Sequence, residues 1–278
     1  MWNSGWGADL SNVVDGLMFA HQSRQQAFSV YTNPATGWHY AAKKDGSRPV
    51  CPERTMQCYF LNMTNCPPNS NRRASYDRQS FLTGQWNGFH QARDYLDFIV
   101  RAQTWLRKEV YDFSTSYERR LSTPCTVLHV RRGDVVLLDP RPRRYHAISE
   151  YMNEKNNVSK SILLLTDDHN AIGEALHDYP NHDWVYINRT RYKGAEGGWE
   201  NHIPSNDPKQ EVVILLSLLR LTRKCDKLIH SKSNLADYIY SEMKSAQTKV
   251  AKINLDQGQG DKVHNERNTL SVSIAKAY

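Results

Sequence analysis

The sequence predicts an α/β fold built on a parallel sheet, and three observations predict it. Short apolar segments at 126–130, 161–166 and 226–230 have the length of buried strands. Helical patterns separate these segments, and strands that alternate with helices form parallel sheets. The length of 278 residues and the 39% apolar content exclude a disordered chain and leave room for two domains or two subdomains that share a cleft.

Residues 1–120 are expected to form an N-terminal α/β subdomain. Ser11 is a candidate N-cap of a first helix, and the segment 27–31 is strand-like. Residues 32–82 are rich in Asn, Pro, Ser and Cys and have weak periodicity, so we expect a long irregular insertion beside the cleft. Apolar residues then recur at helical spacing over 84–120.

Residues 121–278 are expected to form the second subdomain. Pro124 ends the preceding helix, and a helical stretch at 146–154 separates the first two strands. Apolar helices at about 209–222 and 235–243 flank the third strand. Ligands bind at the carboxyl ends of the strands in open parallel sheets, so the polar residues at three strand ends predict one binding site.

Two adjacent arginines, Arg131 and Arg132, follow the first strand. One guanidinium can bind a diphosphate through its fixed fork of donors while the other holds the loop. A fixed arginine stabilises the charge that grows on a nucleotide sugar's diphosphate as the glycosidic bond breaks. The chain has no D-x-D triplet, so we expect a transfer without a metal ion. His129 is a candidate contact to the base or ribose, or else a structural strand residue.

The third strand ends in a second polar cluster. Ser231, Ser233 and the helix that begins at about Asn234 are either a phosphate-binding site or ordinary helix caps. Asp134 is either a general base or the residue that orients the arginines, and Asp139 is freer to reach an acceptor hydroxyl.

The charge and hydropathy of the sequence limit the classes of binding partner and the cellular location that we expect. The net charge of +7 is spread along the chain, with one dense patch at 141–144. A solvated basic face is the default interpretation, a phosphate-bearing small ligand comes next, and nucleic acid ranks last. No apolar run approaches the length of a membrane span. Residues 1–7 lack a signal-peptide pattern, so we expect a cytoplasmic location unless the sequence is a segment of a secretory-pathway enzyme.

The cysteines and the glycosylation sequons carry less information. The five cysteines match no zinc-binding spacing, and we expect free thiols. Three N-x-[ST] sequons begin at Asn62, Asn157 and Asn188, and a cytoplasmic protein would leave them unmodified.

Six segments follow one another in an order that resembles a known superfamily. They are residues 5–10 (GWGADL), 101–109, 129–134 (HVRRGD), 146–152, 165–168 (LTDD) and 229–234. The set is similar to the fucosyltransferase superfamily, which includes the core α1,6-fucosyltransferases, the rhizobial nodulation fucosyltransferases and, more remotely, the protein O-fucosyltransferases. The resemblance covers roughly two thirds of the chain.

The resemblance implies a GT-B-like fold, in which two Rossmann-like subdomains face a cleft. Residues 1–120 would lie on the acceptor side, and residues 121–278 would bind the donor. It also implies an inverting, metal-independent transfer of fucose from GDP-fucose to a hydroxyl of an oligosaccharide or glycoprotein, with no cofactor besides the donor. The oligomeric state stays open.

The resemblance also assigns residue roles. The donor-binding residues that it implies are His129, Arg131, Arg132, Ser233 and Asn234. The matched segments and the strand ends add Gly5, Gly7, Asp167 and Ser231 as candidates. The implied catalytic residues are Arg131 at the diphosphate and Asp139 as the base. Asp134 stays a further catalytic candidate from its position after the two arginines.

Two departures from the superfamily matter: the first removes a cation that would support the base, and the second keeps the donor open. Val135 stands where the α1,6 enzymes have a lysine, and Leu216 or Leu218 stands where an aspartate pairs with guanine. Guanine needs an acceptor that uracil does not need. A UDP-sugar such as UDP-xylose is therefore the alternative donor. A non-catalytic glycan-binding protein is the alternative of another class.

Overall fold

The computed structural model describes residues 6–22, 38–42, 49–63, 93–132, 145–191 and 206–256. Its centre is a five-stranded sheet in which all neighbouring strands are parallel, in the order β3-β2-β1-β4-β5. The strands are β1 (Cys125–Val130), β2 (Ser161–Thr166), β3 (Asp183–Val185), β4 (Lys227–His230) and β5 (Ala251–Asn254). The predicted α/β class with a parallel sheet is confirmed.

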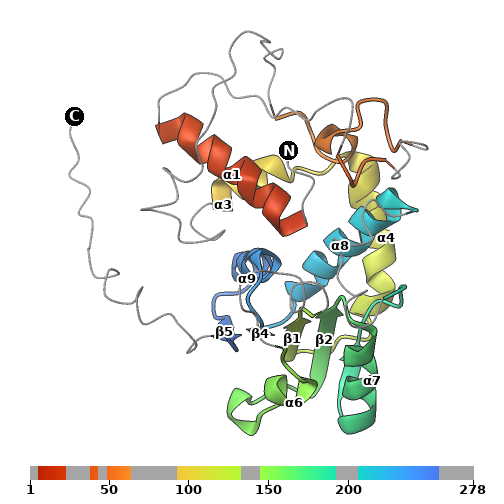
Figure 1. Cartoon of the computed structure of the whole chain (residues 1–278), viewed down its shortest axis with the longest axis vertical. Helices are drawn as coiled ribbons and strands as arrows, with labels where there is room; N and C mark the ends of the chain where they lie inside the picture. The colour runs from red at the N-terminus through yellow and green to blue at the C-terminus, as the bar shows by residue number, and fades with distance from the viewer. Residues whose placement is uncertain are drawn as a thin grey trace, which may run out of the picture.

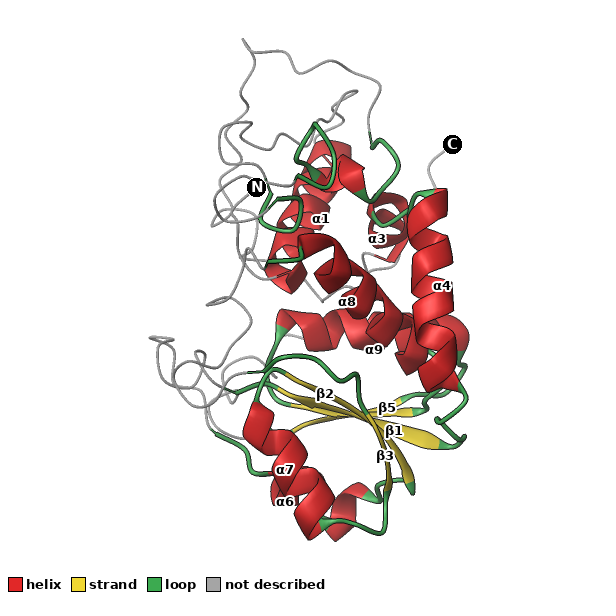
Figure 2. Ribbon diagram, turned by 90° about the vertical axis from the view of Figure 1, so that its right-hand side faces the viewer, coloured by secondary structure: helices red, strands yellow, loops and turns green. Residues whose placement is uncertain are grey.

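Helices cover both faces of this sheet (Figures 1 and 2). One face carries α6 (Ile148–Tyr151) and α7 (His169–Asp178), and the other carries α8 (Pro208–Thr222) and α9 (Asn234–Ala246). Beyond α8 and α9 lie the helices α1 (Trp6–Gln22), α3 (Arg93–Ile99) and α4 (Thr104–Glu118). Two 3-10 turns, η1 (Met56–Cys58) and η2 (Glu154–Asn156), complete the described elements.

Burial on both faces explains why the central strands are continuous apolar runs. Val127 of β1 faces the core under α8 and α9, whereas Leu128 and Val130 face the core under α6 and α7. Successive side chains of a strand point to opposite faces, so a strand covered on both sides needs an apolar residue at nearly every position.

The N-terminal helix packs closely on α9. A Cβ atom at Gly7 would lie 2.9 Å from the backbone nitrogen of Leu235, so only glycine allows this contact without a shift. The helix begins at Trp6, and Ser11 is a buried residue inside it. The prediction that Ser11 caps the helix is therefore wrong. The strand expected at 27–31 lies outside the described residues.

The described parts of the predicted insertion contribute aromatic residues to the core. Trp38, Tyr40 and Phe60 are each at most 1% exposed and surround the Trp6 ring, with ring centroids 5.3 to 5.9 Å from it. The helical pattern over 84–120 also divides, because the chain between α3 and α4 is not helical and Ala102 forms a bridge with Phe60. These aromatic residues fill the core, whereas the sequence predicted only an irregular segment; its expected place beside the cleft remains a prediction.

One hydrophobic cluster joins the two predicted subdomains. It includes Trp6 and Leu10 of α1, Val127 of β1 and Met243 of α9. The described residues before 120 contain helices and an isolated bridge but no strand. The division into subdomains 1–120 and 121–278, and the two-subdomain GT-B-like arrangement, remain predictions.

Two disulfides correct the expectation of free thiols. Cys51 pairs with Cys58, and Cys125 at the start of β1 pairs with Cys225 just before β4. Spacing could not reveal these pairs, because the second joins residues 100 positions apart that only the sheet brings together. Cys66 lies outside the described residues.

We expect the two disulfides to differ in their effect on stability. A cross-link restricts the unfolded chain more when it closes a longer loop, by about 2 kcal/mol more for a loop of 100 residues than for one of 7. Replacing Cys125 and Cys225 with alanine should therefore lower the free energy of unfolding more than replacing Cys51 and Cys58. Urea unfolding of the two double variants measures the difference, and equal losses would contradict the expectation.

No helix in the described part of the chain is both long and apolar enough to cross a membrane.

Candidate functional site

The strand order reverses between β1 and β4, and we refer to the carboxyl ends of these two strands as the crevice. From β1 the chain continues through β2 to β3 on one side, whereas β4 and β5 lie on the other side. Crevices at the carboxyl ends of strands where the order reverses are the usual ligand sites of open parallel sheets. Three of the predicted site residues, Arg131, Asp167 and Ser231, come together here.

Arg131 is held at the carboxyl end of β1 by contacts from both neighbouring strands. Its Nη1 forms an ion pair with Oδ2 of Asp167, which follows β2. Its backbone N–H donates to the Ser231 hydroxyl, 3.4 Å away, which follows β4. The Arg131 and Asp167 side chains are 11% and 8% exposed. The guanidinium therefore has a fixed position at the crevice and does not point into bulk solvent.

Arg132 has a different environment because consecutive side chains of an extended chain point to opposite faces. Its side chain is 1% exposed and lies on the α7 side of the sheet. Nη1 and Nη2 each donate to Glu174 of α7 at 2.8 Å, and Nη1 also donates to Asp168 at 3.0 Å. Nε donates to the carbonyl oxygen of His146 at 3.0 Å. Arg132 thus ties the ends of β1 and β2 to the α6–α7 layer.

Glu174 gives this network a pH dependence. Burial alone would raise the pKa of Glu174, but hydrogen bonds from Arg132 and the Ile148 backbone hold it below the ordinary value of 4.5. A carboxyl group with a lowered pKa stabilises the fold fully above its unfolded pKa, and this stabilisation is lost as the pH falls through the folded pKa. We expect Glu174→Gln to be less stable at pH 7 and to lose less stability below pH 4.5. Urea unfolding at both pH ranges tests this, and parallel pH profiles would contradict it.

Two buried histidines lie side by side next to the crevice. His129 of β1 and His230 of β4 are partners in the parallel register and are 4% and 3% exposed. Burial lowers the pKa of His129 to about 3, and His230 and Arg131 add to the effect, so the ring is neutral at pH 7. Nδ1 of His129 and Nε2 of His230 have no hydrogen-bond partner among the described residues. Buried polar atoms without partners are rare and mark places where a ligand can supply the bond.

Arg191 was not singled out by the sequence. It follows β3 and donates to the carbonyl oxygens of Thr166, Ile187 and Arg189. Burial and the nearby charge of Arg189 lower the pKa of Arg191 to about 10, so it remains charged at pH 7. Arg189 forms an ion pair with Glu211 of α8 at 2.9 Å. Within the described chain, Arg191 forms no ion pair, although the charge of Asp167 acts on it.

The serine cluster after β4 has structural roles. The Ser233 hydroxyl accepts from the Leu235 N–H at 3.2 Å and caps α9, and Gly7 of α1 packs against the same turn. Asn234 is the first residue of α9. Beside them is a cavity of about 210 Å³, which is lined by His230, Lys232, Ser233, Asp237, Lys252 and Asn254.

Other predicted site residues, Gly5, Asp134 and Asp139, lie outside the described residues, so their roles remain predictions. Within the described ranges, no group of three or more His, Cys, Asp or Glu side chains could hold a metal ion. The expectation of a metal-independent reaction also remains a prediction.

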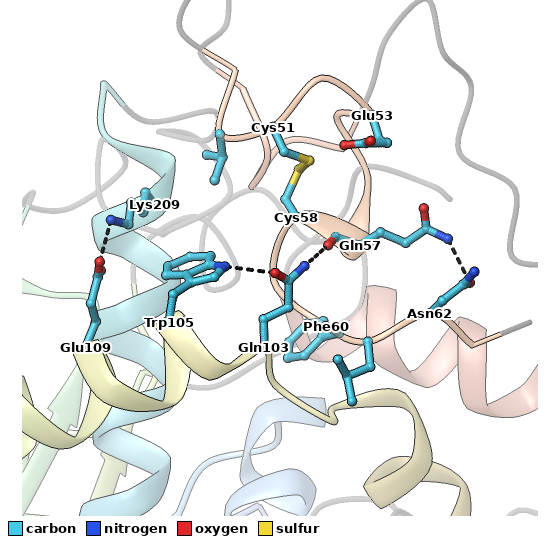
Figure 3. A pocket seen from close by; sticks show the side chains of 12 residues that line it. Cys51, Glu53, Gln57, Cys58, Phe60, Asn62, Gln103, Trp105, Glu109 and Lys209 are labelled. Atoms are coloured by element: carbon cyan, nitrogen blue, oxygen red, sulfur yellow. Dashed lines mark hydrogen bonds and ion pairs between the residues drawn. A yellow bond between two sulfur atoms is a disulfide. The ribbon is translucent and has the colours of Figure 1, made fainter.

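A second, larger cavity of about 660 Å³ lies between η1, α4 and the start of α8 (Figure 3). One wall carries the Trp105 ring, whose Nε1 donates to Gln103 at 3.0 Å, and the ion pair of Lys209 with Glu109 at 2.6 Å. The opposite side carries Gln57, which donates to the side chain of Asn62 at 2.9 Å. Aromatic, amide and paired charged groups thus surround this cavity, which gives it the character of a site for a neutral polar ligand.

The first turn of α8 lies between the larger cavity and the strand-end site. Lys209 lines the larger cavity, whereas Glu211, two residues later, pairs with Arg189 beyond the carboxyl end of β3. Residues two apart on a helix do not share a face. The first turn of α8 therefore separates the cavity from the strand-end site.

Comparisons with known proteins give only a partial structural similarity. No protein-family model matches the chain, and the search of curated proteins found no match. NodZ α-1,6-fucosyltransferase soaked with GDP-fucose is similar over 55% of this chain and 46% of its own chain, at 15% identity and a TM-score of 0.35.

Two further NodZ structures give nearly the same values. NodZ co-crystallised with GDP is 14% identical over 54% of this chain and 45% of its own, with a TM-score of 0.35. Fucosyltransferase NodZ from Bradyrhizobium is 13% identical over 54% and 46%, with a TM-score of 0.34. The chain thus spans about half the length of these enzymes. This similarity assigns neither a family nor a donor to the chain.

Proposed function

We propose that this protein is a glycosyltransferase that binds a nucleotide sugar at the carboxyl ends of β1 and β4. The observation that carries the proposal is the surplus of fixed positive charge at this edge. Asp167 pairs with Arg131, but Arg191 is half-buried, charged and in no ion pair among the described residues. A diphosphate would supply the missing negative charge. His129 of β1 and His230 of β4 each have a ring nitrogen without a hydrogen-bond partner among the described residues, and a nucleoside would bond to them.

The proposed reaction is a single displacement. An acceptor hydroxyl attacks the anomeric carbon of the donor sugar, the bond from that carbon to the diphosphate oxygen breaks, and a carboxylate takes the hydroxyl proton. Arg131 stabilises the charge on the departing diphosphate, and Asp167 keeps the guanidinium in place before the donor arrives. Asp139, or else Asp134, is the proposed base.

GDP-fucose is the first donor to test, and UDP-xylose is the second. The leucines Leu216 and Leu218 of α8 pack against the hydrophobic core. Neither side chain offers the acceptor that guanine needs. This observation favours the UDP-sugar, whereas the resemblance in sequence favours GDP-fucose.

The cavity beside Trp105 supports a saccharide acceptor. Sugars present apolar C–H faces and many hydroxyl groups, which suit an aromatic ring next to amide side chains such as Gln57 and Gln103. The same cavity would serve a glycan-binding protein without catalysis. Release of GDP or UDP in the presence of a glycan separates the two functions, because only the transferase produces it.

Thermal shift with GDP, UDP, GDP-fucose and UDP-xylose tests the donor site. A ligand that binds only the folded protein stabilises it by about 2.7 kcal/mol at a concentration 100 times its Kd. We expect one nucleotide family to raise the melting temperature. Arg191→Met should weaken this response about tenfold or more in apparent affinity. Lys160→Met, an exposed change at the opposite edge of the sheet, should not. No shift with any of the four ligands would overturn the proposal.

A further inference from the structure

We propose that Asn157 carries an N-linked glycan and that the chain matures in an oxidising, secretory compartment. The proposal does not depend on the glycosyltransferase activity. It rests on the disulfides, on the exposure of the three sequons, and on the position of Asn157 at the edge of the sheet opposite the candidate site.

The disulfides indicate the compartment. All four cysteines in the described part of the chain are paired. Cys125 and Cys225 are completely buried, and their bond joins the starts of the two strands that flank the crevice. Structural disulfides persist in secretory and extracellular compartments, whereas cytosolic thiols are kept reduced. The chain therefore would encounter the machinery that modifies N-x-[ST] sequons, which removes the reason to discount them.

All three sequon asparagines are exposed, but they differ in their surroundings. Asn62 lines the larger cavity and accepts a hydrogen bond from Gln57. Asn188 follows β3 and lies next to Arg189 at the carboxyl edge of the sheet. A glycan at either residue would lie against a candidate site.

Asn157 is the best-placed of the three. It ends the 3-10 turn η2 in the left-handed conformation, with φ 45°. Its backbone is anchored, because its N–H donates to Glu154 and its carbonyl accepts from Lys227. Its side-chain amide forms no hydrogen bond in the described structure, in contrast to the amide of Asn156, which donates to two carbonyl oxygens. The turn thus presents a free amide on a fixed backbone.

The position of Asn157 also keeps a glycan away from the crevice. Asn157 precedes β2, whose first residue is Ser161, so it lies at the amino edge of the sheet. Arg131 and Asp167 lie at the carboxyl edge, beyond six-residue strands. Six residues of strand span about 20 Å. A glycan at Asn157 therefore extends into solvent on the side of the sheet opposite the proposed donor site.

The modification transfers an oligosaccharide from a lipid-linked oligosaccharide diphosphate. A bond forms between the side-chain nitrogen of Asn157 and the anomeric carbon of the first sugar. The bond between that carbon and the diphosphate oxygen breaks, the lipid diphosphate leaves, and the nitrogen loses one proton to the transferring enzyme.

Mass spectrometry of the full chain secreted from eukaryotic cells tests the site. We expect the peptide with Asn157 to carry a glycan, and glycosidase release to convert Asn157 to aspartate. Asn157→Gln and Ser159→Ala should each remove this glycan, whereas Ser159→Thr, which keeps the sequon, should retain it. Asn181→Gln is the matched control, because Asn181 is exposed and lies outside any sequon. An unmodified Asn157 in the folded, secreted protein would overturn the assignment.

Expression without a secretion signal tests the compartment. We expect chain made in a reducing cytosol to have free thiols at Cys125 and Cys225 and a lower melting temperature than the secreted chain. Equal melting temperatures with reduced thiols would overturn the inference that the fold needs an oxidising compartment. Neither outcome bears on nucleotide binding, so the proposed function is tested separately by thermal shift.

Discussion

Replacing Arg131 with alanine is expected to slow sugar transfer about 10²- to 10³-fold, as the loss of one fixed donor to a developing anion does in other enzymes. The side chain of Arg131 lies at the crevice between β1 and β4, and Asp167 holds it there before any ligand binds. Its charge matters most when the diphosphate departs, so turnover should fall more than donor affinity. Nucleotide release at saturating donor, together with thermal shift for donor binding, measures the two effects.

The variant needs a control because it removes the Arg131 ion pair from the buried Asp167 carboxylate. The Arg131→Ala/Asp167→Asn double variant also removes the carboxylate charge and should recover stability but not turnover. Arg131→Lys keeps the charge and loses the fork, so we expect intermediate turnover. Near-normal turnover of a folded Arg131→Ala variant would remove this residue from the mechanism.

Replacing Arg132 with alanine is expected to destabilise the fold by about 3 to 5 kcal/mol, the range found when one partner of a buried ion pair is removed. The change would leave Asp168 with a buried carboxylate and Glu174 without its two hydrogen bonds, and it would free the carbonyl of His146. The free energy of unfolding in urea measures this loss. Alanine at these two neighbouring positions should thus have different effects: Arg131→Ala lowers turnover, and Arg132→Ala lowers the stability of the fold.

A matched variant distinguishes the network from a general effect of losing an arginine. Arg107 of α4 is exposed, and its described contact is a 3.2 Å hydrogen bond to Thr104, so Arg107→Ala should change stability by at most about 0.5 kcal/mol. A loss of stability at Arg132→Ala no greater than at Arg107→Ala would show that the buried pairs do not hold the α7 layer.

The central strands β1 and β2 could be predicted because strands buried on both faces are apolar at nearly every position. The segments 126–130 and 161–166 are apolar at nearly every position, and the structure places β1 and β2 within one residue of them. The strand β5 was missed because it is four residues long, lies at an edge and contains exposed Ala251 and Lys252. β3 was missed because three residues are too few to show an alternation of apolar and polar side chains.

The ion pairs of Arg131 and Arg132 with the two aspartates after β2 could have been predicted from the apolar segments. β1 and β2 are both six residues long and pair in register, with Val130 opposite Thr166. The residues that follow then lie side by side, which brings Arg131 to Asp167 and Arg132 to Asp168. Arg191 could not be found this way, because its contacts are to backbone carbonyls, which leave no mark on the residue pattern.

Fastening β1 to β4 at both ends has a consequence for recognition. The Cys125–Cys225 disulfide joins the amino ends of the two strands, and the hydrogen bond from the Arg131 N–H to Ser231 joins their carboxyl ends. The carboxyl ends of β1 and β4 therefore hold their relative position before a ligand binds. Capture of a nucleotide there should need little rearrangement of these strand ends, so its association rate should be governed by diffusion and electrostatic steering, and should fall as salt is added.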